Sequence, residues 1–421
     1  MIDLSLRDRP ASAATPMRGV LSVLMLAVFT ISVGFGILLS QLPALIERLL
    51  GSASTPAQIA RATGLMTALY MLALFICAPF WGWLSDSWGR RRVLLIGLAG
   101  FGATTIAAAL FETLATVYVE RALSGIFAAA ITPVALAAVT DFSSGTGTTG
   151  RRLSFISMAG ISGFLLGPTL GVALQRLTGA GGDVALTVPL LASGGLALVA
   201  AIAVAVTLPG KLMRAQRPAE ASVQARAPRL VWQLLILGFV VSVGVSAFEV
   251  GLTLRGKQEM GLAPLQIATM FTLCSLVMIV AQAAVFSPLV RPEFTRWLVA
   301  PAFAILALGL FAVPLAGNFT LMLVVTGGVA ASAGILSPIL TYWIATEAGH
   351  KSGAGLGKQT SAASLGAAVG SAAGGLLYGA TWLPNAAFVL TASVALLAVW
   401  PSLRLPGRLM AGAATKLQID S

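Results

Sequence analysis

The sequence predicts an all-α integral membrane protein with twelve transmembrane helices, and three observations carry this prediction. Hydrophobic residues make up 57% of the 421 residues and charged residues only 10%, whereas a soluble domain carries about 25% charged residues. The mean hydropathy is +0.93. Twelve apolar segments, most near the roughly 20 residues that a helix needs to cross a bilayer, follow one another along the chain. Most of the exterior must therefore face lipid.

The spans can be placed in order from the apolar runs. The first run starts near Gly19 and is too long for the apolar core of a signal peptide, so we interpret it as a retained span. The twelve predicted spans cover approximately residues 19–46, 60–84, 93–111, 114–140, 153–175, 187–208, 230–254, 265–289, 297–315, 319–345, 359–379 and 385–403.

Basic residues determine the predicted orientation. An even number of spans puts both termini on one side. Placing them in the cytoplasm puts 20 of the 26 Lys and Arg residues there and 5 on the opposite side, with Arg121 left inside a span. This asymmetry follows the positive-inside rule. The net charge of +12 thus lies in short gaps between spans and does not indicate nucleic-acid binding.

The source and compartment follow from composition. Arginine outnumbers lysine, and alanine and glycine are abundant, which favours a bacterial source. We therefore predict a multi-pass protein of the bacterial inner (cytoplasmic) membrane, with both termini cytoplasmic and the lipid bilayer as its surroundings.

The chain divides into two halves of six spans. The longest internal connection, residues 209–229, is polar, basic and contains proline, so we interpret it as a cytoplasmic linker between bundles at 1–208 and 230–421. Short patterns recur at half-chain spacing: Ser32-Val33-Gly34 and Ser242-Val243-Gly244 are 210 residues apart, and the triplet Gly163, Gly167, Gly171 recurs 203 residues later as Gly366, Gly370, Gly374. Such parallel repeats are how many transporters are built, and they predict two pseudo-symmetric bundles.

The most specific local pattern follows the second span and reads Gly82-Trp83-Leu84-Ser85-Asp86-Ser87-Trp88-Gly89-Arg90-Arg91-Arg92. We expect Gly82 to allow close approach of a neighbouring helix and Asp86 to end the span with a charge. Gly89 permits a tight turn, and the arginines hold this turn in the cytoplasm. A loop that only set topology would need the arginines alone.

This spacing resembles the loop signature of the major facilitator superfamily, and the twelve spans, the six-plus-six division and the basic central linker resemble that family over the whole chain. Ser87 departs from the basic residue that is usual there. The resemblance implies that Asp86, Arg90 and Asp141, at the cytoplasmic end of the fourth span, form a charge cluster that latches the outward-facing state. The alternative for Asp141 is a solvated acid at a helix end.

The fifth span carries a second pattern, with Gly160, Gly163, Gly167, Pro168 and Gly171. Small residues every four positions let helices pack closely, and proline bends or loosens a helix. A simple packing face is one interpretation. The Gly-Pro-x-x-Gly arrangement also resembles the antiporter motif of drug–proton exporters, shortened here because Val172 stands where a second glycine is usual. This resemblance favours export over uptake.

Charges inside the spans form a third pattern. Arg121 lies about 12 Å into the fourth span at 1.5 Å per residue, where a buried charge should face a cavity or a partner. With Gly125 it resembles the family's Arg-x-x-x-Gly element, which is implicated in proton coupling. A structural arginine bonded to carbonyls is the alternative.

Glu249 is the acid well inside an apolar stretch of the second half, and we expect it to carry the proton. Glu120 is the rival, but adjacent residues of a helix point in different directions.

These observations predict a proton-coupled exporter of small lipophilic or amphipathic molecules that works by alternating access. The family resemblance places the cavity between spans 1, 4, 7 and 10, and the candidate lining residues beside Arg121 and Glu249 are Gly34, Gly36, Gln41 and Tyr342. An uptake symporter for a small metabolite has the same fold, and a membrane scaffold or enzyme is an alternative of another class. We expect a monomer that is no enzyme and needs no cofactor or metal.

Overall fold

The computed structural model describes residues 17–51, 54–109, 113–142, 146–178, 187–209, 228–285, 294–348, 352–378 and 385–407. Within these ranges the chain is helical and contains no β-strand. The helices are α1 (Met17–Leu50), α2 (Pro56–Trp88), α3 (Arg90–Ala108), α4 (Leu114–Ala128), α5 (Ile131–Phe142), α6 (Thr146–Thr178), α7 (Thr187–Thr207), α8 (Pro228–Gln258), α9 (Pro264–Val285), α10 (Thr295–Ala312), the 3₁₀ turn η3 (Val313–Leu315), α11 (Phe319–Ala348), α12 (Ser352–Leu376) and α13 (Ala386–Leu403).

The predicted fourth span is divided into two helices. The α4 helix ends at Ala128, and α5 begins at Ile131 after a two-residue turn. Pro133 explains the break, because it has no N–H to offer the carbonyl of Ala129 and its ring crowds that carbonyl. Together α4 and α5 still form one apolar stretch long enough to cross a membrane. Thirteen α-helices therefore account for twelve predicted spans.

Eleven of these spans, as far as the chain is described, are long and apolar enough to cross a membrane, and α12 is the one below that threshold. The α12 helix is rich in glycine, alanine and serine. It packs against α2 on one side and α8 on another, so it needs little lipid-facing surface. A helix covered by protein can be less apolar than one exposed to lipid.

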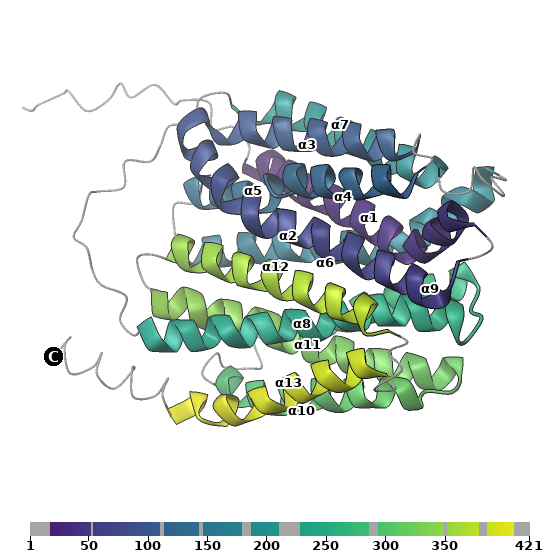
Figure 1. The fold of residues 1–421 in the computed structure, drawn as a ribbon. Helices are drawn as coiled ribbons and strands as arrows, with labels where there is room; N and C mark the ends of the chain where they lie inside the picture. The colour runs from purple at the N-terminus through teal and green to yellow at the C-terminus, as the bar shows by residue number, and fades with distance from the viewer. Residues whose placement is uncertain are drawn as a thin grey trace, which may run out of the picture.

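The helices form two bundles that follow chain order. In Figure 1 the purple-to-blue helices of the first half lie above the green-to-yellow helices of the second half, and α2 and α12 lie side by side where the halves meet. A second contact between the halves joins α6 and α9. The linker predicted at 209–229 falls mostly outside the described residues.

The two bundles repeat the same close helix packing. Gly167 of α6 lies against α1, where an added Cβ would sit 2.7 Å from the Val33 carbonyl oxygen. Gly370 of α12 lies in the same way against the carbonyl of Val243 in α8. Val33 and Val243 are 210 residues apart and the two glycines 203 apart. The two predicted offsets thus correspond to one helix–helix contact used twice.

The hydrophobic core is shared at one end of the molecule only. One cluster of buried residues contains Leu38–Ile46 of α1 and Ile59–Met66 of α2 together with most of the second bundle. The other cluster contains Val20–Ile31 of α1 and residues of the first bundle alone. We call the end that carries Glu47 the joined end, and the end that carries Asp86 and Arg90 the basic end.

Candidate functional site

The loop signature places three charges together at the basic end. Arg90, the first residue of α3, pairs with Asp86 of α2 at 2.6 Å and with Asp141 of α5 at 3.0 Å. Its guanidinium also donates a hydrogen bond to the Ser85 hydroxyl. The structure therefore brings together the three residues of the predicted cluster. The cluster ties α2, α3 and α5 of the first bundle to one another.

The two glycines of the signature differ in their surroundings. Gly89 connects α2 to α3 with φ +92°, a left-handed conformation that favours glycine, which agrees with the predicted tight turn. An added Cβ at Gly82 would meet no atom within 4 Å. The expectation that Gly82 is in close contact with a neighbouring helix is therefore wrong for this conformation, because no atom of the described residues packs on that face of α2.

Arg121 and Glu120 form a buried ion pair in the first bundle. The Arg121 Nε and Nη2 atoms each donate to one carboxylate oxygen of Glu120 at 2.6 Å. Both side chains are at least 94% buried. The expectation that these neighbours point apart is wrong, because the long arginine side chain curls back to the acid beside it. The guanidinium of Arg121 thus binds a carboxylate, whereas the alternative interpretation expected backbone carbonyl groups.

Aromatic rings continue from this ion pair to the second bundle. The Arg121 guanidinium carbon lies 5.5 Å from the ring centre of Tyr70, and Tyr70 stacks on Phe35 at 5.1 Å. Phe35 in turn stacks on Phe164 at 5.7 Å, and Phe164 meets Phe271 of α9 edge to face at 5.8 Å. We call Tyr70, Phe35, Phe164 and Phe271 the aromatic row. It links a buried charge pair to the contact between the bundles.

The aromatic row cannot be recognised from the sequence alone. Aromatic residues are common in apolar spans, and a ring that faces lipid has the same sequence context as one that faces another helix. The one sequence feature that points to this region is Gly125 of the Arg121-x-x-x-Gly125 element, because a glycine in a span allows another helix to approach closely. An added Cβ at Gly125 would lie 2.7 Å from the Tyr70 carbonyl oxygen. Gly125 therefore lets α2 and α4 approach closely at the level of the ion pair.

Glu249 lies on α8, in the second bundle. Its side chain is half-buried, and within the described part of the chain its carboxylate forms no hydrogen bond or ion pair. Over the same part of the chain Glu249 shares no ion pair with Arg121. The two predicted coupling residues therefore belong to separate bundles.

The predicted cavity residues on α1 divide into two groups. Gly34 packs on Ser193 of α7 and Phe101 of α3, and Gly36 packs on the Phe164 carbonyl of α6. Both glycines thus serve contacts within the first bundle, which corrects their assignment as cavity-lining residues. Pro168 explains the second contact, because it has no N–H for the Phe164 carbonyl, and that carbonyl is directed at Gly36.

Gln41 has a different environment. Its Oε1 accepts a hydrogen bond of 2.6 Å from the Nε2 of Gln175 in α6. Its own Nε2 is buried and has no hydrogen-bond partner among the described residues. Gly171, the last glycine of the antiporter-like motif, makes room for this amide, since an added Cβ would lie 2.8 Å from it. Tyr342 of α11 packs its ring against Trp343.

Polar contacts join the bundles at the joined end. Lys257 of α8 pairs with Glu47 of α1, and the neighbouring Gln258 donates to the Pro56 carbonyl of α2 at 3.3 Å. Deeper in the molecule, the hydroxyls of Thr169 and Thr272 are 2.8 Å apart between α6 and α9.

A glycine pair brings α2 and α12 together near the same end. An added Cβ at Gly64 would lie 2.5 Å from the Cα of Gly375. Backbone therefore packs on backbone here. In the part of the chain that the structure describes, no group of three or more His, Cys, Asp or Glu side chains could hold a metal ion.

Comparison with known proteins gives one family. The model of the Major Facilitator Superfamily matches residues 24–357. Multidrug resistance protein 2 of Bacillus subtilis is 26% identical over 370 residues, which cover 85% of this chain and 88% of that protein. Quinolone resistance protein NorA of Staphylococcus aureus is 24% identical over 368 residues, covering 85% and 89%.

Solved structures share the fold. The crystal structure of the human organic anion transporter MFSD10 superposes with a TM-score of 0.70 at 21% identity, covering 92% of this chain and 99% of that one. The crystal structure of a D-xylose-proton symporter gives a TM-score of 0.74 at 14% identity, with 92% and 97% covered. At these identities the likeness concerns the fold.

Proposed function

Because this chain belongs to the Major Facilitator Superfamily, we propose that it is a secondary active transporter that exports small lipophilic or amphipathic molecules in exchange for protons. One observation carries the mechanism: the bundles share a hydrophobic core at the joined end and have separate cores at the basic end. A carrier that alternates between two openings needs such an asymmetry in each of its end states.

The basic end is the cytoplasmic one in this proposal. The positive-inside rule supports that orientation, with both termini in the cytoplasm of a bacterial cell. The conformation described here is then closed toward the outside by the Lys257–Glu47 pair and the Gly64–Gly375 contact. Export requires the reverse state, in which the joined end separates and the basic end closes. The Asp86–Arg90–Asp141 cluster lies at that closing end but is already formed in the present conformation and joins helices of the first bundle only. The expectation that it latches the outward-facing state is therefore wrong, and we assign it the role of holding the basic end of the first bundle together.

Glu249 is the proposed proton carrier. Burial in a span without a counter-ion disfavours the charged form of a carboxylate, so binding a proton removes the free-energy cost of the buried charge. Glu120 is already neutralised by Arg121 through two hydrogen bonds, which makes it the less suitable site for a proton. The Arg121–Glu120 pair instead holds the end of the aromatic row.

The aromatic row and the Gln41 amide are the proposed contacts for cargo. Phe35 and Phe164 are only partly buried, and ring faces bind flat lipophilic molecules and organic cations. The unpartnered Nε2 of Gln41 offers a hydrogen-bond donor. The names of the relatives, which refer to multidrug and quinolone resistance, support a lipophilic cargo and the outward direction.

The test is transport in a bacterial strain that lacks its own exporters. Cells that express the chain should tolerate several lipophilic drugs or dyes better than cells with an empty vector. Inside-out vesicles should accumulate the same compounds when their interior is acidified, and a protonophore should abolish accumulation. Accumulation by right-side-out vesicles under an inward proton gradient would instead establish the uptake symporter. Absence of any gradient-driven movement would favour a scaffold or another non-transport role.

Two further parts of the proposal concern assembly and chemistry. We propose a monomer, because the two bundles of one chain pack on each other through a shared hydrophobic core. The proposed cycle makes and breaks no covalent bond in the cargo, so the chain acts as a carrier and not as an enzyme.

A further inference from the structure

A cleft lies between α8 and α13 of the second bundle, at the basic end. It is formed where α8 begins and α13 ends, and its volume is about 430 Å³. Small-molecule sites range from about 300 to 1,000 Å³. The lining residues are Arg229, Trp232, Gln233, Ile236, Leu237, Trp400, Pro401 and Arg404.

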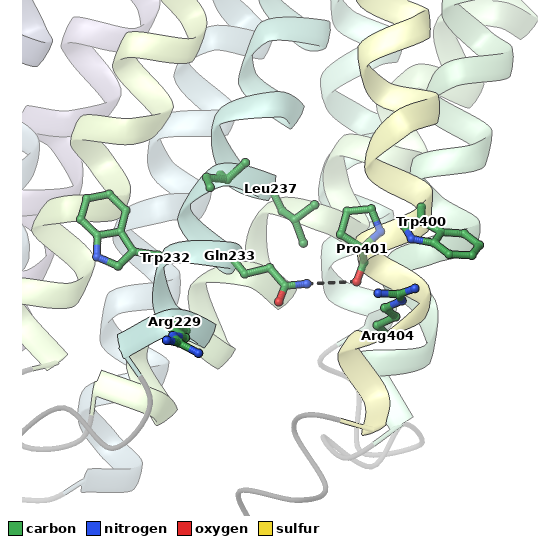
Figure 2. Close-up of a pocket in the computed structure, with 8 residues that line it drawn as sticks. Arg229, Trp232, Gln233, Leu237, Trp400, Pro401 and Arg404 are labelled. Atoms are coloured by element: carbon green, nitrogen blue, oxygen red, sulfur yellow. Dashed lines mark hydrogen bonds between the residues drawn. The ribbon is translucent and has the colours of Figure 1, made fainter.

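A hydrogen bond fixes the width of this cleft. The Nε2 of Gln233 donates to the Pro401 carbonyl oxygen at 3.0 Å and so bridges α8 and α13 (Figure 2). In the same view Arg229 and Arg404 lie on the side of this bond toward the helix ends, and Leu237 lies on the opposite side. The charged side chains of the cleft therefore lie near the helix ends, and its apolar side chains lie farther along the helices.

The two arginines carry positive charge that no acid among the described residues neutralises. Neither Arg229 nor Arg404 takes part in an ion pair within the described ranges, and no acid lines the cleft. The Arg404 guanidinium is placed by a ring instead, with its central carbon 4.8 Å from the centre of Trp400. A guanidinium held against a ring keeps its N–H donors free for a planar or tetrahedral anion.

The apolar part of the cleft suits a membrane. Trp232 is 62% exposed, Trp400 64% and Ile236 58%. Tryptophan is enriched where a bilayer meets water, because its ring is apolar and its N–H is polar. Ile236 lies one turn after Trp232, toward the bilayer interior. A soluble anion would gain nothing from this surface, whereas a lipid would bury it.

From these features we propose that the cleft between α8 and α13 binds one anionic phospholipid, with its phosphate at Arg229 and Arg404 and an acyl chain along the exposed Ile236. The basic end faces the leaflet in which such lipids attract basic residues, and basic pockets between spans bind their headgroups. The proposal uses the membrane setting of the family and is independent of the cargo and the direction of transport.

Native mass spectrometry of the full chain, released from detergent in the presence of phosphatidylglycerol, tests this. We expect one tightly held phosphatidylglycerol in the wild type. The variant R229Q/R404Q should bind it about thirtyfold more weakly, from about fivefold for each arginine near an anionic surface. R229K/R404K should recover part of the affinity. R176Q, which removes an exposed arginine at the opposite end, is the matched control and should bind like the wild type.

Three outcomes would overturn the proposal. Equal retention of phosphatidylcholine would remove the role of lipid charge, and equal loss in R176Q would remove the role of the site. Competition by millimolar inorganic phosphate as effective as that by phosphatidylglycerol would make it a small-anion site. Thermal unfolding in detergent checks that R229Q/R404Q is folded. If R229Q/R404Q is unfolded, the single variants R229Q and R404Q take its place, each with an expected loss of about fivefold.

Discussion

The carboxylate of Glu120 holds the guanidinium of Arg121, its neighbour in the chain, through two hydrogen bonds of 2.6 Å inside the first bundle. Taking two charges out of water is costly, and the pair is stable only while both members are present. Arg121 also faces the ring of Tyr70. The pair thus couples a buried charge to the aromatic row at the contact between the bundles.

We expect E120Q to be strongly destabilised, because it leaves the Arg121 charge buried without a counter-ion. Removing one member of a buried pair costs about 3–5 kcal/mol. The double variant E120Q/R121Q should recover most of the thermal stability in detergent but transport poorly, since the cation facing Tyr70 is lost. A double variant with full transport would show that the pair serves stability alone.

E249Q should abolish proton-driven transport and leave cargo binding unchanged. The amide cannot take up or release a proton, while its size and burial match those of the acid. Binding is measured by quenching of intrinsic fluorescence and transport in energised inside-out vesicles. E259Q, which changes an exposed acid just beyond the end of the same helix, is the control, because the amide oxygen can still accept hydrogen bonds from Arg255 and Tyr378. It should transport at a rate within about twofold of the wild type. Normal coupling in E249Q would exclude Glu249 as the proton carrier.

Arg90 and Asp141 should tolerate exchange of their charges better than either change alone. R90D places a third acid beside Asp86 and Asp141 at the basic end, and D141R places a second arginine beside Arg90. The double variant R90D/D141R restores an attractive pair between α3 and α5. We expect each single variant to lose most transport and the double variant to recover part of it, measured at matched expression. Absence of any recovery would contradict a role for this pair.

Much of the fold is predictable because lipid imposes a simple rule. Each span must be apolar and about 20 residues long, which is why all twelve spans could be marked in the sequence, although α12 is less apolar than the other eleven. The break at Ala129 and Ala130 was predictable from Pro133, although we expected a continuous span. The half-chain offsets also anticipated the repeated contact of Gly167 with Val33 and Gly370 with Val243.

The direction in which each side chain points was not predictable. In water the apolar side of a helix marks the core, but a transmembrane helix is apolar on all sides and its sequence does not mark the face that packs. This is why Gly34 and Gly36 were assigned to a cavity and Glu120 was separated from Arg121. The loop signature did place Asp86, Arg90 and Asp141 together, because a specific spacing carries information that hydropathy lacks.

The last prediction concerns two glycines on one face of α2. Gly64 and Gly82 are 18 residues apart, which is five helical turns, yet Gly64 packs on Gly375 of α12 and Gly82 meets no atom. Gly357 precedes Gly375 by the same 18 residues, so closing the basic end should bring Gly357 to Gly82.

A leucine in place of a closely packed glycine overpacks the contact, which costs about 1–3 kcal/mol. We therefore expect G64L to lower thermal stability in the present conformation. G82L should leave that stability unchanged but slow transport, since the same overpacking cost disfavours the opposite state by about 5- to 150-fold. G195L, at an open position of α7, should do neither. Equal thermal destabilisation by G64L and G82L would contradict alternation between two closed ends of the α2–α12 contact.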